Sequence, residues 1–145
     1  MDKYISLAHG NGGRYMRELI ADVFARHLAD PQRAGSLNVT LDAAPIELIG
    51  EGMPYMTTDG FIVKPLEFPG GDIGSLAVNG TVNDLAVAGA TPCYLSLNAF
   101  IEEGLEIATL ERIVRSLGNA ARAAGVQVVA GDTKVLPRGE GGGLY

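Results

Sequence analysis

Three aspartates and a lysine lie at points of the chain where they could act together. Asp59 ends the segment TTD, Asp84 lies in VNDLAVAGA, and Asp132 precedes Lys134 in GDTK. Carboxylate oxygens suit Mg²⁺, which usually takes one or two of them together with phosphates and water. A lone aspartate at a strand end is usually a turn or cap residue, and a surface lysine is the alternative interpretation of Lys134. Three carboxylates, a lysine that could offset phosphate charge and several glycines next to helix and strand ends are nevertheless the materials of a magnesium–phosphate site.

Asp84 is the most informative of the three carboxylates. It lies in a predicted helix that is otherwise built from alanine, valine, leucine and glycine. A carboxylate buried there without a partner would be costly, so we expect it to meet a cation, hydrogen-bond donors or an open cleft. Its neighbour Asn83 could bind phosphate or orient Asp84, and a helix-packing amide is an equally good interpretation.

Two glycine segments are candidates for holding phosphate. Asn11, Gly12 and Gly13 belong to the segment HGNGG, and Gly70 and Gly71 precede an aspartate that could cap a helix. Glycines let backbone N–H groups face an anion, and the helix that begins after Gly13 offers its positive end. No Gly-Lys-Ser/Thr follows, so the pattern is not a P-loop. A merely flexible loop over residues 6–13 and an ordinary helix cap at the second segment are the alternatives.

Alternating helices and strands must position these residues. Apolar spacing predicts helices at Arg14–Leu28, Ile73–Ala88 and Ile107–Ala124, the second buried against a sheet because its small residues let a backbone approach. Gly131-Asp132 is expected to be a turn between two strands. The predicted strands are Leu37–Leu41, Ile46–Ile49, Pro54–Thr58, Phe61–Val63, Pro92–Ile101, Val126–Ala130 and Thr133–Leu136.

Composition narrows the class of protein. A chain of 145 residues with 47% hydrophobic residues can bury the core of one domain. The net charge of −6 argues against general nucleic-acid binding. Cys93 is the single cysteine, so no internal disulfide forms, which fits a reducing cytosol. The N-terminus has no apolar signal core, and no apolar run approaches the roughly 20 residues of a membrane helix.

The ordered set HGNGG, TTDGF, FPGGDIGSLAVNGTVNDLAVAGA, FIEEGL and GDTK covers nearly the whole chain. It resembles the ATP-binding half of the aminoimidazole ribonucleotide (AIR) synthetase superfamily, and within it the HypE family of hydrogenase maturation proteins. The resemblance implies an α+β, PurM N-terminal-like domain, with a mixed sheet covered by helices on one face. Sheets of two copies are expected to pair into a barrel. Residues 1–145 would form the N-terminal domain, with the C-terminal domain absent and Leu144-Tyr145 beginning a strand.

The resemblance also implies a ligand set. ATP and Mg²⁺ would be the cofactors, with Asp59, Asp84 and Asp132 holding the metal on the phosphates. Asp42, in LDAAPIEL, resembles a segment that supplies further metal ligands, but Leu41 replaces the first of its two aspartates. The family uses ATP to dehydrate an S-carboxamide on a C-terminal cysteine to a thiocyanate. That cysteine is expected in the absent domain, so this chain alone is predicted to be inactive.

The expected partners follow from the same resemblance. They are a second copy of the chain, the carbamoyltransferase HypF and the HypC–HypD complex, in the cytoplasm, with neither nucleic acid nor membrane. Two alternatives stay open: a kinase of the same superfamily, similar to thiamine-monophosphate kinase, and a non-catalytic dimerisation and docking module. Retained nucleotide binding would argue against the docking module.

Overall fold

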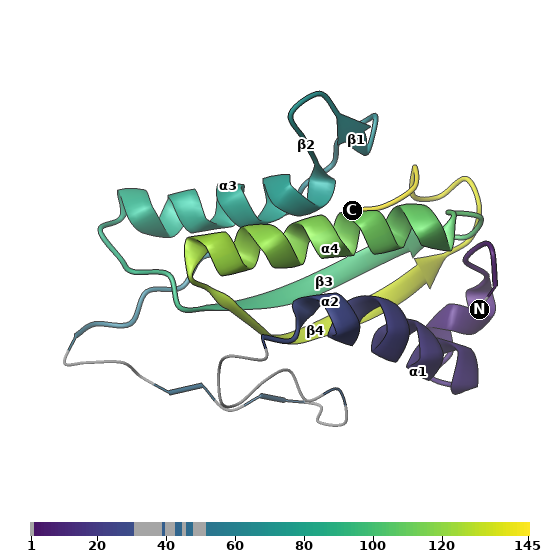
Figure 1. The fold of residues 1–145 in the computed structure, drawn as a ribbon, viewed down its shortest axis with the longest axis horizontal. Helices are drawn as coiled ribbons and strands as arrows, with labels where there is room; N and C mark the ends of the chain where they lie inside the picture. Colours follow the sequence, from purple (N-terminus) through teal and green to yellow (C-terminus); the bar gives the residue numbers. More distant parts are fainter. Residues whose placement is uncertain (1, 31–38, 40–42, 45, 48–51) are drawn as a thin grey trace.

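Helices lie side by side over one face of a pair of parallel strands (Figure 1). The computed structural model describes residues 2–30, 39, 43–44, 46–47 and 52–145. In chain order, the elements are η1 (Leu7–Gly10), α1 (Arg14–Leu19), η2 (Ile20–Ala25), α2 (Arg26–Leu28), β1 (Glu67–Phe68), β2 (Gly71–Asp72), α3 (Ile73–Val87), β3 (Tyr94–Glu102), α4 (Ile107–Ala124) and β4 (Gln127–Leu136).

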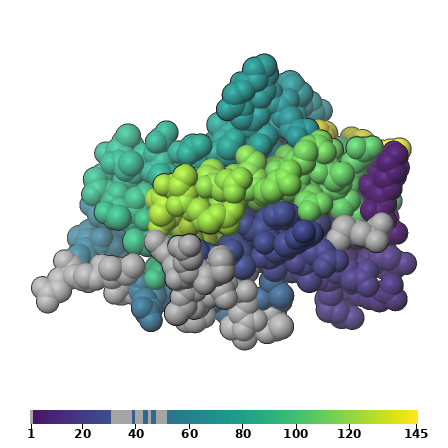
Figure 2. Space-filling view, viewed as in Figure 1, coloured from purple at the N-terminus to yellow at the C-terminus, as the bar shows by residue number. Residues whose placement is uncertain are grey.

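The central helix α4 has the predicted bounds. Its apolar residues recur at helical spacing and are buried, and the helix ends at Gly125, whose φ of 71° is in the left-handed region that glycine adopts without strain. Figure 2 shows α4 across the middle of the helical face, between α3 and the N-terminal helix. The buried residues of this helix are Ile107, Leu110, Ile113, Val114, Leu117, Gly118 and Ala121.

The predicted N-terminal helix is confirmed, and it spans residues 14–28 as α1, the π-helical η2 and α2 in succession. It buries Leu19, Val23, Phe24 and Leu28. Contact with α4 is close: a Cβ at Gly118 would lie 2.2 Å from the backbone oxygen of His27. Only glycine at this position lets the two backbones approach so nearly.

Helix α3 begins with the predicted cap. The Ser75 N–H donates to Asp72 Oδ1 at 2.9 Å, and the Asp72 N–H donates to Ser75 Oγ at 3.1 Å. The expectation that α3 is buried against the sheet is wrong, because it packs beside α4. A Cβ at Gly74 would lie 2.4 Å from the Ile113 backbone oxygen, and one at Gly80 would lie 2.4 Å from the Phe61 ring. The small residues of α3 thus serve a helix and an aromatic ring.

Strands β3 and β4 are parallel, and β4 is one strand where a turn at Gly131-Asp132 was predicted. The turn prediction is wrong because Gly131 lies inside β4, where its missing side chain lets β4 approach β3 closely. A Cβ at Gly131 would lie 2.3 Å from the backbone oxygen of Leu97 on β3. The register shifts once, between Leu95 and Ser96. Asn98 of β3 therefore lies opposite Asp132 of β4.

Leu144 and Tyr145, where the sequence predicted the beginning of a strand, form an isolated antiparallel bridge with β3 but no strand. Tyr145 N–H donates to the Phe100 oxygen at 3.1 Å and Phe100 N–H donates to the Tyr145 oxygen at 2.7 Å. Leu144 forms an antiparallel bridge with Ile101. The sheet of β3 and β4 is parallel, so the predicted mixed sheet is not seen in the described residues. Among the described helices, none is long and apolar enough to cross a membrane.

The strands predicted at Pro54–Thr58 and Phe61–Val63 are absent from the structure. A strand forms only where a neighbour pairs with its backbone, and these residues enter neither described sheet. They lead instead to the β1–β2 hairpin, in which Gly70 has a φ of 93°. Most of the strand predicted at Leu37–Leu41 and half of that predicted at Ile46–Ile49 lie outside the described residues.

Candidate functional site

Asp132 and Lys134 form an ion pair on one face of β4. Lys134 Nζ lies 2.5 Å from Asp132 Oδ2, and both side chains are about half exposed. The alternation of a strand puts them on the face opposite the buried Thr133, next to the exposed Asn98 of β3. The hydrogen bond from Lys134, followed by that from the Thr133 N–H, lowers the pKa of Asp132. Asp132 is therefore an ionised, accessible carboxylate.

Asp84 lies toward the C-terminal end of α3 and contacts the segment that carries Asp59. Thr57 Oγ1 donates to Asp84 Oδ2 at 3.4 Å, and Asp59 follows Thr57 by two residues. The Asp59 carboxylate accepts the Gly60 N–H at 2.8 Å. Of the partners expected for Asp84, a hydrogen-bond donor is present in Thr57, and Asn83, Asp84 and Asp59 are all exposed. Because Asp84 is exposed, its charge does not require a cation as a partner, but its carboxylate remains accessible to one.

A large, mostly apolar cavity of about 1460 Å³ lies between α3, β3 and the segment 52–62. Its polar lining includes Thr57, Asp59, Ser96 and Asn98. Asp132 lines a separate cavity of about 160 Å³ beside the N-terminal helix. Asp59 and Asp132 thus line two different cavities, and Asp84 lines neither of them.

The donor chemistry fits a magnesium ion, although the ligands are not assembled. In the described part of the chain, no three histidine, cysteine, aspartate or glutamate side chains are placed to hold a metal ion together. Mg²⁺ needs only one or two carboxylates when phosphates and water complete its six oxygen ligands. Asp59, Asp84 and Asp132 supply such oxygens, and Asp42 lies outside the described residues. The metal-ligand set stays a prediction.

Gly70 and Gly71 lie far from these carboxylates. They precede the first turn of α3, whereas Asn83 and Asp84 lie near its end, and a rise of roughly 1.5 Å per residue separates the two ends by about 18 Å. The φ of Gly70 is explained by the hairpin turn that it makes. One phosphate therefore could not contact both groups, and a phosphate role for Gly70 and Gly71 stays a prediction.

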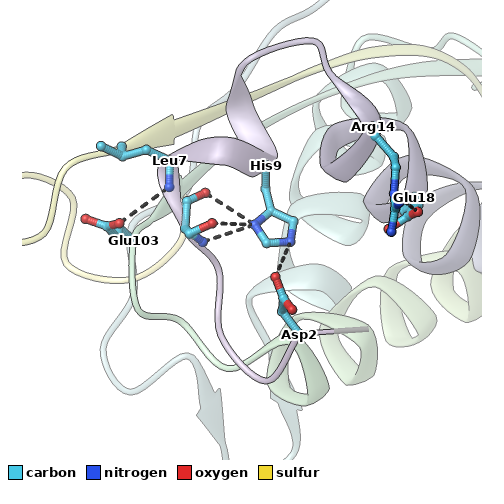
Figure 3. A network of polar contacts seen from close by, with 7 residues as sticks. Asp2, Leu7, His9, Arg14, Glu18 and Glu103 are labelled. Atoms are coloured by element: carbon cyan, nitrogen blue, oxygen red, sulfur yellow. Dashed lines mark hydrogen bonds and ion pairs between the residues drawn. The ribbon is translucent and has the colours of Figure 1, made fainter.

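The N-terminal segment is more ordered than predicted. Leu7–Gly10 form the 3-10 helix η1, so residues 6–13 are not one flexible loop. The cause is His9, which is 2% exposed and whose Nδ1 accepts the Ser6 N–H at 3.1 Å, while its Nε2 lies 3.9 Å from Asp2 (Figure 3). Asn11, Gly12 and Gly13 follow as exposed residues. A Cβ at either glycine would meet nothing within 4 Å, which leaves room for a ligand.

Glu102 is a polar residue that the sequence did not single out. Glu102 is the last residue of β3, and residues 103–104 form a turn after it. The Glu102 carboxylate accepts backbone N–H groups from Gly139, Gly141, Gly142 and Gly143. The glycine-rich run after Pro137 was the available signal. The glycine run alone did not indicate which residue accepts its N–H groups, because Glu102 is about 40 residues away in the sequence.

Comparison with known proteins identifies the class. Residues 41–144 match the family described as AIR synthase related protein, N-terminal domain. The chain belongs to this family. Its relatives within the family are HypE hydrogenase maturation proteins. It is 52% identical over 141 residues to the hydrogenase expression/formation protein HupE of Azotobacter chroococcum mcd 1, covering 97% of this chain and 40% of the relative.

The carbamoyl dehydratase HypE of Escherichia coli strain K12 is 46% identical over 136 residues, covering 93% of this chain and 40% of the relative. The chain thus spans about 40% of the length of the curated relatives that it matches. Among solved structures, a HypE in complex with ATP superposes with a TM-score of 0.86 at 50% identity, covering 95% of this chain and 39% of that one. A HypE–HypF complex gives a TM-score of 0.60 at 40% identity, with coverages of 91% and 39%.

Proposed function

We propose that this chain is the ATP-binding part of a HypE-type carbamoyl dehydratase that acts in hydrogenase maturation. The observation that carries the proposal is its similarity, over 95% of its length, to a HypE structure in complex with ATP. Its relatives are hydrogenase maturation proteins, which favours this function over that of a thiamine-monophosphate kinase.

In this proposal, Mg²⁺ would neutralise charge on the ATP phosphates, and Asp59, Asp84 and Asp132 would hold it. Lys134 keeps Asp132 ionised now and could move to a phosphate oxygen when a cation takes its place. Asn11, Gly12 and Gly13 would contact the nucleotide with backbone N–H groups. The exposure of these side chains and the open space around the glycines support these roles, which the family resemblance implies.

The reaction of the whole protein would remove water from an S-carboxamide on a cysteine. The amide oxygen would take the γ-phosphoryl group of ATP and leave as phosphate, while the amide nitrogen loses two protons and the carbon–nitrogen triple bond of the thiocyanate forms. Cys93 is the one cysteine of the sequence, and its Sγ donates to the Thr91 oxygen at 3.4 Å. By family resemblance, the cysteine that carries the carboxamide is a C-terminal one and not Cys93.

Calorimetric titration with Mg·ATP tests the nucleotide site, with EDTA as the metal control. We expect binding that EDTA abolishes and that Asp132→Asn weakens at least roughly tenfold, since a metal carboxylate is lost. Asp22→Asn, an exposed aspartate of η2, is the matched control and should bind normally. Equal affinity in a folded Asp132→Asn chain would refute the metal role. Failure of the full-length protein to bind Mg·ATP would refute the function.

We also propose that two copies of the chain pair through the segment 53–62, and that HypF is a partner. The segment exposes Met53, Tyr55, Met56 and Ile62, of which Met56 is 95% exposed. Such a run of apolar side chains favours an interface, and a solved HypE–HypF complex is similar to this chain. HypC–HypD stays an expectation from the family.

Sedimentation equilibrium would test the pairing of two copies. Met56→Lys should shift the chain toward monomer, because a lysine ammonium is costly to bury. Val87→Lys is the control, since Val87 is 87% exposed on α3 outside the segment. A dimer that resists Met56→Lys as well as Val87→Lys would refute this interface.

A further inference from the structure

The carboxylate of Glu102, at the end of β3, lies in a pocket of backbone N–H groups. Its Oε1 accepts Gly139 N–H at 2.7 Å, and its Oε2 accepts Gly141 N–H at 3.2 Å, Gly143 N–H at 2.9 Å and Gly142 N–H. Three of these glycines have positive φ, of 91°, 76° and 115° for Gly139, Gly142 and Gly143. Successive N–H groups aimed at one point in this way form an anion-binding nest.

The same loop delivers the last residues of the chain to β3. Glu102 N–H donates to the Gly143 oxygen at 2.8 Å, and Tyr145 and Phe100 exchange two backbone hydrogen bonds. Leu144 is 8% exposed and bridges Ile101, and the rings of Tyr145 and Phe100 stack with centroids 5.6 Å apart. The seating of the loop therefore sets the register of this antiparallel pair.

The charges around the loop also favour an anion. A Cβ at Gly142 would lie 2.6 Å from Lys64 Nζ, so this cation approaches the loop, whereas the guanidinium of Arg138 lies against Gly104, next to Glu103 in the chain. Of the nearby acids, Glu103 turns toward the Leu7 N–H at 3.4 Å and Glu140 is exposed. Glu102 is thus the acid whose carboxylate enters the nest.

We propose that the glycine loop 139–143 is a carboxylate-binding nest, that its resident ligand is the side chain of Glu102, and that this occupancy latches Leu144-Tyr145 onto the edge of β3. Without the side chain, the nest would be an open site for a small carboxylate anion. Glu102 is a positioning residue in this proposal.

The latch has a defined dependence on pH. The N–H bonds, that of Gly139 first, hold the pKa of Glu102 below its ordinary value of 4.5. A lowered carboxyl pKa contributes stability that is complete above the unfolded value and is lost as pH falls through the folded value. The latch is therefore closed at neutral pH, and acid opens it.

Amide hydrogen exchange measured by NMR on this chain would test the latch. Glu102→Gln removes the charge at nearly constant size, so exchange at Gly141–Gly143 and Tyr145 should accelerate by roughly tenfold or more. Glu103→Gln, one residue on, makes one long N–H contact in the wild type and should leave these rates unchanged. Formate added to Glu102→Ala should shift the loop amide signals and slow their exchange again, and should do neither in the wild type.

Three outcomes would overturn the proposal. The first is that the loop amides exchange as slowly in Glu102→Gln as in the wild type. The second is that formate changes neither the signals nor the exchange of Glu102→Ala. The third is that formate affects the wild type as much as it affects Glu102→Ala. If the variants do not fold, an acid titration of the wild type decides. The loop amide shifts must then follow the Glu102 carboxyl signal, and titration at a different pH would exclude Glu102 as the ligand.

Discussion

Replacing Gly131 by alanine tests the close strand contact beside Asp132. The added Cβ would lie 2.3 Å from the backbone oxygen of Leu97, whereas ordinary contact begins at 3.4 Å, so β3 and β4 must separate by about 1 Å. Overpacking of this kind costs about 1–3 kcal/mol. Restricting the unfolded chain returns about 0.4–1 kcal/mol.

The net destabilisation of Gly131→Ala is then about 1–2 kcal/mol. For a chain of this length that lowers the thermal midpoint by roughly 4–8 °C. Circular dichroism during a thermal ramp measures the midpoint. Because the separation moves Asp132 from its position opposite Asn98, the same variant should weaken Mg·ATP binding.

Gly60→Ala is the matched control for that measurement. A Cβ at Gly60 would meet nothing within 4 Å, and its φ lies outside the positive region. Only the unfolded-state effect remains, so its midpoint should stay the same or rise by up to about 4 °C. A Gly131→Ala midpoint equal to or above that of Gly60→Ala would refute the contact argument.

Three further variants test single interactions. Asp72→Ala removes the α3 cap and should cost about 1 kcal/mol, a fall of roughly 4 °C in the thermal midpoint. Lys134→Met should raise the carboxyl pKa of Asp132 toward 3.8, and carbon NMR would measure this pKa. In the wild type, the contribution of Asp132 to stability is complete above that pH and is lost as pH falls through the lowered pKa. An unchanged pKa would contradict the ion pair. Arg112→Ala removes two hydrogen bonds to Glu67 and should speed amide exchange in the β1–β2 hairpin without changing that of β3.

The helices were predictable because their signals are local. The stripe of apolar residues in α4, followed by Gly125, defines the helix from 18 consecutive residues. Asp72 and Ser75 cap α3 within one turn, so the start of that helix is also local. The face to which α3 packs was not predictable, since Gly74 fits a helix backbone as well as a sheet.

The strands required information from distant residues. Glycine at position 131 suits a turn and a close strand contact equally, and only the opposing oxygen of Leu97 decides between them. Residues 54–58 have strand-like composition, but a ladder needs a partner that local sequence does not name. The residues that pair with the free edge of β3 are instead Leu144 and Tyr145, far from residues 54–58 in the sequence.

The candidate site depends on the segment 52–62, which was predicted to contain strands and has none. Asp84 is held in place by the hydrogen bonds of the helix α3, and Asp132 by those of the strand β4. Asp59 lies in the segment without a strand partner, which contacts Asp84 through the 3.4 Å hydrogen bond from Thr57. A cation held by Asp59 and Asp84 would therefore also order the segment 52–62. Assembly of the site and pairing of that segment are then expected to occur together.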